Sequence, residues 1–228
     1  MVLEPIFERE FMPTSFGFRP GKGCKDALRR VEGLMRAGYT WVIDADLKSY
    51  FETIPHDRLM AEVKRHVADS RVLDLIEGFL KQQILEDLKY WTPERGTPQG
   101  AVISPLLSNI YLHEVDKRVR DAGYEMVRYA DDFVILCKSR QESEAALAWV
   151  TALARERGLT LHSDKTSLVA THEAGQGFDF LGYHFENGTR WPRKKSLKKF
   201  KDAIRRKTRR SNGRSMAAII HDVNLTTV

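Results

Sequence analysis

The chain has 228 residues, 42% of them hydrophobic, and a net charge of +6 from 37 Lys and Arg against 31 Asp and Glu. This size supports one large or two small globular domains with a real core, and the two cysteines, Cys24 and Cys137, are too far apart in the sequence to indicate a disulfide framework or a zinc cluster. No apolar run approaches the ~18 residues that span a bilayer and no signal peptide opens the chain, so we expect a cytoplasmic protein, in a bacterium or inside an organelle, with no membrane partner.

The first half of the chain alternates helical and strand patterns after a turn-rich opening, "PTSFGFRPGKG". The strand pattern "TWVIDADL" places Val42, Asp44 and Asp46 on one side of a sheet. We expect helices at residues 24–39, from Pro55 through "HDRLMAEVKRHV", at 70–83 and at 104–121, with a weak hairpin at 84–91 followed by the loop "TPERGTPQG".

The second half continues with an acidic hairpin around Asp131, a helix at 141–157 and a strand at 159–169 that is interrupted by a turn at Ser163 and Asp164. The segment "FDFLGYHFENGTRW" predicts a further hairpin, signalled by Asn187-Gly188, before the final basic helices. This order favours a platform of strands with helices behind it.

The acidic hairpin sets Asp131 and Asp132 between an apolar strand and the continuous buried pattern "FVILC". Adjacent ionised carboxylates so close to a dry core repel each other, a cost that is usually offset by a cation or by hydrogen bonds. The alternative is a solvated turn, which is the ordinary interpretation of an isolated acidic pair.

A third acid, Asp46, ends the first strong strand. In an antiparallel sheet this strand can lie beside the acidic hairpin, although 85 residues separate Asp46 from Asp131. Three converging carboxylates suit a pair of Mg²⁺ ions about 3.5 to 4 Å apart, and these hard oxygen ligands argue against a dedicated zinc site.

The cationic excess lies in one segment, residues 190–214, which holds 13 Lys and Arg against a single acid. Leu197, Phe200 and Ile204 recur at helical spacing, so we expect one helix face to dock while another offers charge. Such a footprint predicts binding of a nucleic acid or another polyanion. The expected nucleic-acid-binding residues are Arg193, Lys194, Lys198, Lys201 and Arg205.

Several blocks occur together in a characteristic order: "SFGFRPGKGCKDAL", "DADLKSYFETIPH", "GTPQGAVISPLLSNIYLHEVD", "YADD", "GLTLHSDKT" and "FLGYHF". In this order and spacing they resemble the motifs of reverse transcriptases, and most nearly those of the group II intron type, reverse transcriptase/maturase. The resemblance implies an α+β fold with a right-hand polymerase palm, partial fingers and the start of a thumb. The expected domains are partial fingers at 1–40, a palm at 41–185 with a fingers segment embedded around 57–100, and a basic linker with the first thumb or maturase helices at 186–228.

The resemblance also implies roles for the acids. Asp46, Asp131 and Asp132 would be the catalytic residues and, with the carbonyl of Leu47, the ligands of two Mg²⁺ ions, for which Mn²⁺ can substitute. Family members carry an earlier fingers segment and continue beyond the first thumb helices, so we expect a fragment or a shortened gene product whose nucleotide and duplex clamps are incomplete.

Further roles follow from the same resemblance. Phe51 would block a ribose 2′-hydroxyl and so select deoxynucleotides, Gln99 and Gly100 would lie by the incoming nucleotide, and Lys165 and Arg19 would approach its phosphates. The residues themselves leave alternatives: Phe51 as core, Lys165 as a solvated turn residue and Arg19 as a brace of its own loop. The turn gripping the primer end would comprise Phe180, Leu181, Gly182 and Tyr183.

The leading functional hypothesis is therefore an RNA-directed DNA polymerase domain of a group II intron protein. It implies an RNA template, a DNA primer, intron RNA and deoxynucleoside triphosphates as partners, and leaves association with a second copy open. The alternative is an RNA-binding splicing cofactor with little or no polymerase activity. A metal nuclease also clusters acids, but it has no need of Phe51 or of the "PQG" loop.

Overall fold

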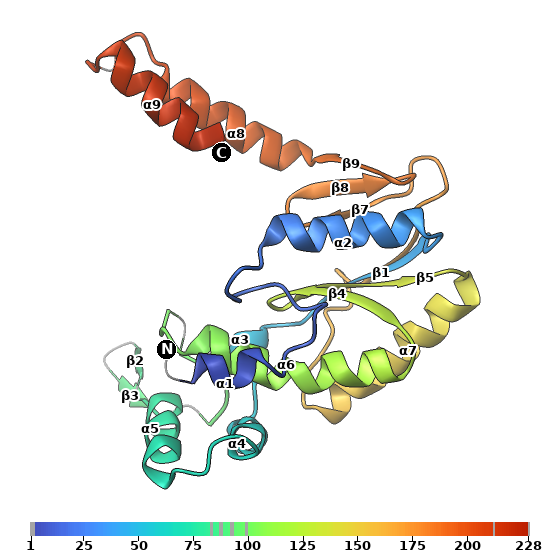
Figure 1. Ribbon diagram of the computed structural model, residues 1–228, viewed down its shortest axis with the longest axis vertical. Helices are drawn as coiled ribbons and strands as arrows, with labels where there is room; N and C mark the ends of the chain where they lie inside the picture. The colour runs from blue at the N-terminus through green and yellow to red at the C-terminus, as the bar shows by residue number, and fades with distance from the viewer. Residues whose placement is uncertain are drawn as a thin grey trace.

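The computed structural model describes residues 3–82, 84–86, 89–91, 94–98, 100–211 and 213–227. Its centre is a four-stranded antiparallel sheet in the order β4-β5-β1-β6 (Figure 1). The strands are β1 (Trp41–Asp46), β4 (Glu125–Tyr129), β5 (Asp132–Cys137) and β6 (Ser167–Ala170). Ile43 lies opposite Ile135, and the pairing of β1 with β5 ends where Asp46 meets Asp132.

Alternation along β1 gives the sheet two different faces. Ile43 and Ala45 enter the larger core with Phe133 and Ile135, and helices cover this face from below (Figure 1). These helices are α4 (His56–Lys64), α6 (Ser104–Asp121) and α7 (Arg140–Glu156), with α5 (Ser70–Leu80) packed against α4.

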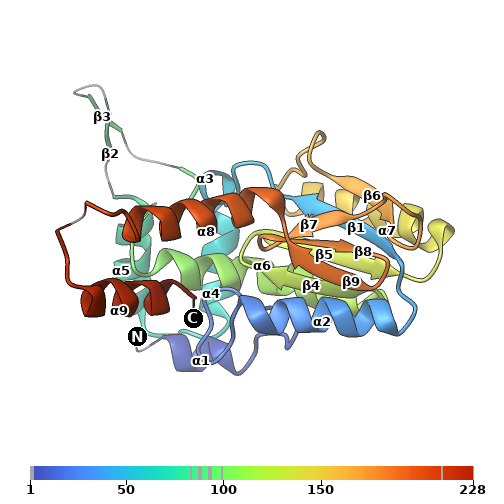
Figure 2. The same cartoon turned by 90° about the horizontal axis from the view of Figure 1, so that it is seen from above.

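The opposite face carries a smaller core around Val42 and Val134. It is covered by α2 (Cys24–Arg36) and by a second sheet of β7 (Phe178–Phe180), β8 (Tyr183–Glu186) and β9 (Thr189–Pro192), as Figure 2 shows from above. Asp44 and Asp46 share this face with Val42, at the end of β1 where the sheet stops.

Both turns of the second sheet use two residues with positive φ, Leu181-Gly182 and Asn187-Gly188. Such turns match the twist of the strands that they join. The Asn187-Gly188 hairpin is therefore as the sequence predicts, and a further strand precedes it.

The remaining elements lie around this body. They are α1 (Glu4–Glu8), α3 (Tyr50–Thr53), the small hairpin of β2 (Ile84–Glu86) and β3 (Lys89–Trp91), and the pair α8 (Lys194–Lys207) and α9 (Met216–Thr227). Helices α8 and α9 run side by side (Figures 1 and 2), and Figure 1 shows that they stand apart from the rest of the molecule. None of the helices in the described ranges has the length and apolarity needed to cross a membrane.

Two sequence-based expectations are wrong in detail. Residues 159–169 do not form one interrupted strand: Leu161 makes an isolated bridge to Leu47, and β6 begins only at Ser167. The apolar face of α8 does not dock on the body, since α8 has no buried residue and Leu197 and Phe200 are 40% and 42% exposed beside α9.

Candidate active site

The turn between β4 and β5 brings the predicted acids to one end of the sheet. Tyr129 pairs with Asp132, which leaves Ala130 and Asp131 as a two-residue turn, and Ala130 adopts a left-handed conformation with φ 59°. Asp132, the first residue of β5, lies directly opposite Asp46 on β1. The expectation that the strand of Asp46 lies beside the acidic hairpin is thus confirmed. We call residues 130–132 the acidic turn.

These carboxylates are crowded and partly buried. Burial, followed by the charges of Asp131 and Asp46, raises the pKa of Asp132 to about 6. The pKa of Asp131 is also raised, first by burial and then by Asp46. A site that raises the pKa of neighbouring acids is short of positive charge.

Lys165 supplies part of that charge. Its Nζ donates to Asp46 Oδ2 at 2.7 Å, which raises the pKa of Lys165. The lysine belongs to the turn at residues 163–165, held beside β1 by the hydrogen bond from His162 N–H to Asp46 O at 2.8 Å. The sequence predicted this turn, and the structure brings its lysine to the acids.

The donor set suits a hard divalent cation. Carboxylate oxygens of Asp46, Asp131 and Asp132 are the ligands that Mg²⁺ prefers. Leu47 occupies a non-hydrogen-bonded position of its bridge to Leu161, so its carbonyl points away from that segment and toward the side of the acidic turn. Among the residues that the structure describes, no three His, Cys, Asp or Glu side chains are placed so that together they could already hold a metal ion.

A fourth acid, Asp44, lies near the other three, and the site predicted from the sequence did not include it. Burial, followed by the charges of Asp132, Asp179 and Asp46, raises the pKa of Asp44 to about 7. The period-two pattern of β1 already placed it on the face of Asp46. Acidic side chains on this face of the sheet therefore extend from Asp46, at the end of β1, to Asp44, two residues earlier.

The loop before α6 packs against the segment that carries Phe51. Thr97 N–H donates to Phe51 O at 2.7 Å, and Gly96 N–H donates to Ile54 O at 2.8 Å. Gly96 has φ +88°, and a Cβ there would lie 2.8 Å from Phe51 O, so only glycine allows this approach. His56 Nε2 lies 2.6 Å from Gly96 O and thus helps to hold the loop.

Phe51 itself is half-buried and meets the Tyr50 ring edge-on at 5.3 Å between centroids. Gly100 has φ +84° with open space around it. Gln99 lies outside the described residues. The loop that carries the predicted nucleotide-binding pair therefore begins against the backbone of Phe51.

The predicted primer-gripping residues divide in two. Phe180 is buried in the smaller core with 1% exposure and has no surface to offer a primer, so this assignment is corrected. Leu181 and Gly182 form the turn, and Gly182 O accepts from Arg193 N–H at 3.1 Å. The charge of Arg193 also lowers the pKa of Asp132. Arg193 therefore contacts the Leu181-Gly182 turn and acts electrostatically on the acids.

Arg19 is a brace rather than a nucleotide ligand, and its assignment is also corrected. Its guanidinium donates to Glu8 Oε1 at 2.6 Å and to the carbonyls of Met12 and Ser15 at 2.6 and 2.8 Å. The side chain is 4% exposed. A fully engaged, buried guanidinium has no donor left for a triphosphate.

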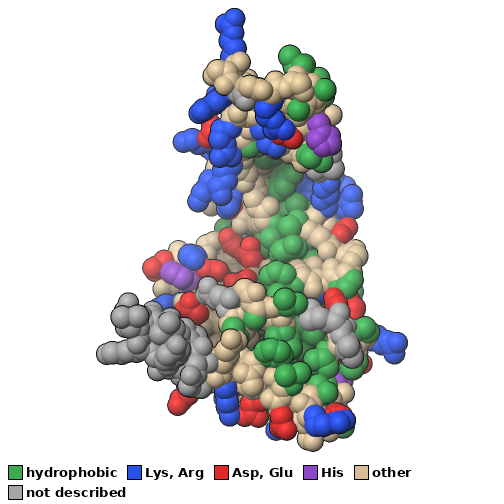
Figure 3. Space-filling view, turned by 90° about the vertical axis from the view of Figure 1, so that its left-hand side faces the viewer, with side chains coloured by type: hydrophobic (Ala, Val, Ile, Leu, Met, Phe, Trp, Pro, Cys, Tyr) green, Lys and Arg blue, Asp and Glu red, His purple; other side chains and the backbone are tan. Residues whose placement is uncertain are grey.

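The predicted basic residues of α8, Lys194, Lys198, Lys201 and Arg205, are all exposed. Figure 3 shows Lys and Arg side chains gathered on the lobe that α8 and α9 form. Arg205 is 3.3 Å from Asp202, and an exposed contact of this kind competes weakly with other anions. The lobe therefore offers cationic surface apart from the acidic turn.

The sequence and the fold of this chain are both similar to those of known proteins. The family model described as "Reverse transcriptase (RNA-dependent DNA polymerase)" matches residues 1–185. The chain belongs to the reverse transcriptase family. Protein YkfC of Escherichia coli is 34% identical, over 80% of this chain and 58% of its own length. The group II intron-encoded protein LtrA of Lactococcus lactis is 40% identical over 52% of this chain and 20% of its own.

These relatives confirm the predicted group II intron reverse transcriptase/maturase type. The chain spans only 58% of the length of YkfC and 20% of the length of LtrA. A solved structure of Candida albicans telomerase with a fragment of telomeric RNA aligns with 99% of this chain and 44% of its own, with a TM-score of 0.67 at 12% identity. That likeness confirms the α+β polymerase fold.

Proposed function

We propose that this chain is an RNA-directed DNA polymerase, which extends a DNA primer on an RNA template. The observation that carries the proposal is the meeting of Asp46, Asp131 and Asp132 at one end of the central sheet. The raised pKa values of Asp131 and Asp132 indicate a site that lacks positive charge, which divalent cations would supply. The family match to residues 1–185 supports the same activity.

The three carboxylates and the Leu47 carbonyl would hold two Mg²⁺ ions, or Mn²⁺ in their place. Bound there, the metal ions would activate the primer 3′-hydroxyl and stabilise the leaving pyrophosphate. The chain itself fixes the position of each acid through the β1–β5 pairing and the two-residue turn. Lys165, bound to Asp46 at 2.7 Å, would move its ammonium to the phosphates of the deoxynucleoside triphosphate when the acids take up cations.

The nucleotide would lie between the acids and the loop before α6. Phe51 would exclude a ribose 2′-hydroxyl, and its half-buried ring, held against Tyr50, suits a fixed wall. Gln99 and Gly100 would contact the nucleotide, and the open space around Gly100 leaves room for such an approach.

The primer and template would lie toward the second sheet and α8. Leu181, Gly182 and Tyr183 would contact the primer end, with Arg193 beside them. The exposed cations of α8 would bind phosphates of the template–primer duplex or of a group II intron RNA.

A second candidate function is that of an intron RNA-binding splicing cofactor, or maturase. The basic lobe of α8 and α9 favours it, because phosphate binding there needs none of the acids. The two functions differ in their dependence on Asp131.

Primer extension on matched RNA and DNA templates tests the proposal. We expect Mg²⁺-dependent incorporation of deoxynucleotides on the RNA template. If the wild-type chain binds intron RNA and stimulates splicing but adds no nucleotide to any primer, the maturase is the better description and the polymerase is refuted.

A further inference from the structure

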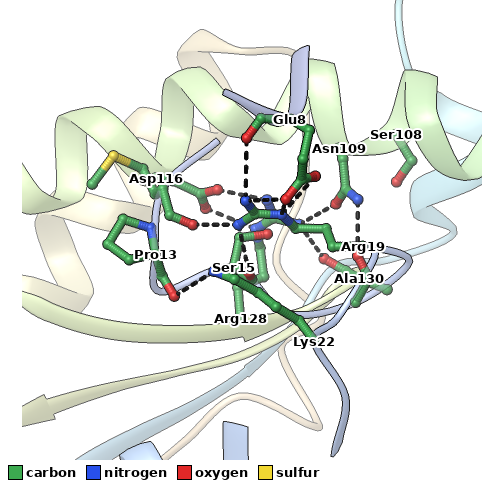
Figure 4. A network of polar contacts seen from close by, with 12 residues as sticks. Glu8, Pro13, Ser15, Arg19, Lys22, Ser108, Asn109, Asp116, Arg128 and Ala130 are labelled. Atoms are coloured by element: carbon green, nitrogen blue, oxygen red, sulfur yellow. Dashed lines mark hydrogen bonds and ion pairs between the residues drawn. The ribbon is translucent and has the colours of Figure 1, made fainter. Parts of the chain in front are cut away.

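One guanidinium lies buried directly behind the acidic turn. Arg128, on β4, has a side chain 1% exposed, and its charge partner Asp116, on α6, is 0% exposed. Burying two charges is costly unless their geometry and hydrogen bonds are nearly complete. The contacts of Arg128 are of that kind (Figure 4).

The guanidinium of Arg128 donates hydrogen bonds to residues of α6 and to the acidic turn. Nε and Nη2 donate to the two carboxylate oxygens of Asp116 at 2.7 and 2.5 Å. Nη1 donates to Asn109 Oδ1 at 3.0 Å and to Ala130 O at 2.8 Å. One end of the guanidinium is thus fixed on α6, and the other holds the first carbonyl of the acidic turn.

The same network fixes the outer side of the turn. Asn109 Nδ2 donates to Gly17 O at 2.9 Å. A Cβ on Gly17 would lie 2.3 Å from Ala130 N, so the backbone of Gly17 rests directly against the turn. Ala130 is held between this backbone and Arg128, in a left-handed conformation that is uncommon for residues other than glycine.

We propose that Arg128, Asp116 and Asn109 are positioning residues that hold the acidic turn in place so that Asp131 and Asp132 can receive cations and substrate. The need for such an anchor follows from the site, because neighbouring carboxylates repel each other and a turn of two residues has little packing of its own. The role of the anchor in catalysis rests on the proposed function, whereas its hold on the turn does not.

The test separates positioning from a merely structural ion pair. Replacing a buried ion pair with apolar residues of similar volume is often neutral or stabilising, so Arg128→Met with Asp116→Leu should keep the fold while removing the hold on Ala130. Arg128→Lys keeps the charge but not the planar fork that reaches both partners. The matched control is Arg157→Met with Glu62→Leu, a mostly buried pair at 2.9 Å that joins the end of α7 to α4.

Each variant of this 228-residue chain is compared by thermal unfolding, by amide hydrogen exchange at residues 129–133 and by Mn²⁺ titration. For Arg128→Met/Asp116→Leu we expect unfolding close to wild type, faster exchange at the turn and Mn²⁺ binding weakened about 10-fold or more. Where the wild type extends primers, kcat should fall about 100-fold with a smaller change in KM. The control pair should leave turn exchange and Mn²⁺ affinity unchanged.

Wild-type exchange at the turn and wild-type Mn²⁺ affinity in a folded Arg128→Met/Asp116→Leu variant would overturn the proposal. If that variant does not fold, Arg128→Lys decides by the same two readouts. A wild-type chain that extends no primer refutes the polymerase alone, since hydrogen exchange still reports whether Arg128 holds the turn.

Discussion

Asp44 shows how the acidic face affects the protein when no cation is bound. Its carboxyl faces Asp46 on its own strand, Asp132 on β5 and Asp179 on β7, and burial with these charges raises its pKa to about 7. A raised pKa means that the folded state binds the proton more tightly than the unfolded state does. Ionisation of Asp44 therefore destabilises the fold as pH rises from about 4 to above 7.

We expect Asp44→Asn to stabilise the metal-free protein at pH 8 by about 1–2 kcal/mol, a figure reduced for partial access to solvent. The gain should shrink as the pH is lowered and vanish below about pH 4, where the Asp44 carboxyl of the wild type is protonated in both the folded and the unfolded state. Urea unfolding in the presence of a chelator measures it. An equal gain at both pH values would show that ionisation of Asp44 is not its cause.

Phe51 presents a different residue-scale question, because its ring is half-buried and could serve packing alone. We expect Phe51→Ala to raise ribonucleotide incorporation relative to deoxynucleotide incorporation, since the substitution removes bulk from the proposed sugar site. Competition between the two nucleotides in primer extension measures the ratio.

Tyr50→Phe is the matched control for Phe51→Ala. It removes the hydrogen bond from Tyr50 Oη to Ser108 O and leaves the Phe51 ring in place, so sugar selectivity should not change. An unchanged ratio in a Phe51→Ala protein that still polymerises would count against the gate.

Sequence reasoning found the three acids because Asp46 ends a strand pattern, and Asp131 and Asp132 lie where one apolar strand pattern gives way to the next. It misassigned Arg19 and Phe180, whose exposure depends on long-range packing that their own motifs do not encode. It could not identify Arg128 as an anchor, because its partners Asp116 and Asn109 lie 12 and 19 residues earlier on a helix. Burial and partner choice are properties of the folded chain.

At the scale of elements, the loop before α6 depends on one glycine. Gly96→Ala would place a Cβ 2.8 Å from Phe51 O at φ +88°, whereas Gly38→Ala meets a similar φ of +91° with open space around it. Strain at φ should cost each variant about 1–3 kcal/mol. We expect Gly96→Ala to lose about 1–3 kcal/mol more from overpacking.

Chemical unfolding of the two glycine variants measures this difference. Equal losses would show that the loop can move away from Phe51 without cost. In that case, the placement of Gly100 relative to the proposed sugar gate would not be fixed by Gly96.

The α8 segment was predicted as a basic helix, and the structure bears this out, but its separation from the body was not foreseen. Periodicity reveals which side chains share a face, not what covers that face. Turn chemistry was more informative: Asn187-Gly188 and the residue pair Ser163-Asp164 both lie in turns. The strand expected across 159–169 failed because apolar content does not show where pairing stops.

The exposed cations of α8 predict a salt-dependent affinity for RNA. If ~6 side chains of the basic segment each neutralise a phosphate, the log–log salt slope should be about −4 to −5. We expect the slope to flatten by roughly 3 units when four residues of α8 become Gln. These residues are Lys194, Lys198, Lys201 and Arg205.

The matched control replaces four exposed cations on α4, α5 and α7 with Gln, and it should leave the slope unchanged. These residues are Lys64, Arg71, Arg140 and Arg155. Fluorescence anisotropy across a salt series gives both slopes. An unaltered slope in the α8 variant would move the RNA path to the body of the molecule.

At the scale of the whole molecule, the two cores meet at one sheet, and the acids lie at the end of that sheet where neither core closes over it. The basic lobe of α8 and α9 stands apart from the body that carries the acids (Figures 1 and 3). Chemistry and nucleic-acid affinity are therefore expected to depend on separate residues. If the proposed polymerase function is right, a single substitution at the acids should therefore abolish nucleotide incorporation and leave RNA binding intact.

Asp131→Asn tests that claim most directly, with Asp164→Asn, a nearby exposed acid, as its control. Deoxynucleotide incorporation on an RNA template and RNA affinity are measured on the same preparations. The account predicts that Asp131→Asn abolishes Mg²⁺-dependent incorporation and leaves RNA affinity within about twofold of wild type, because the loss of one ligand does not touch the phosphate contacts of α8. Wild-type incorporation by Asp131→Asn, or an equal loss of both activities in a folded variant, would contradict it.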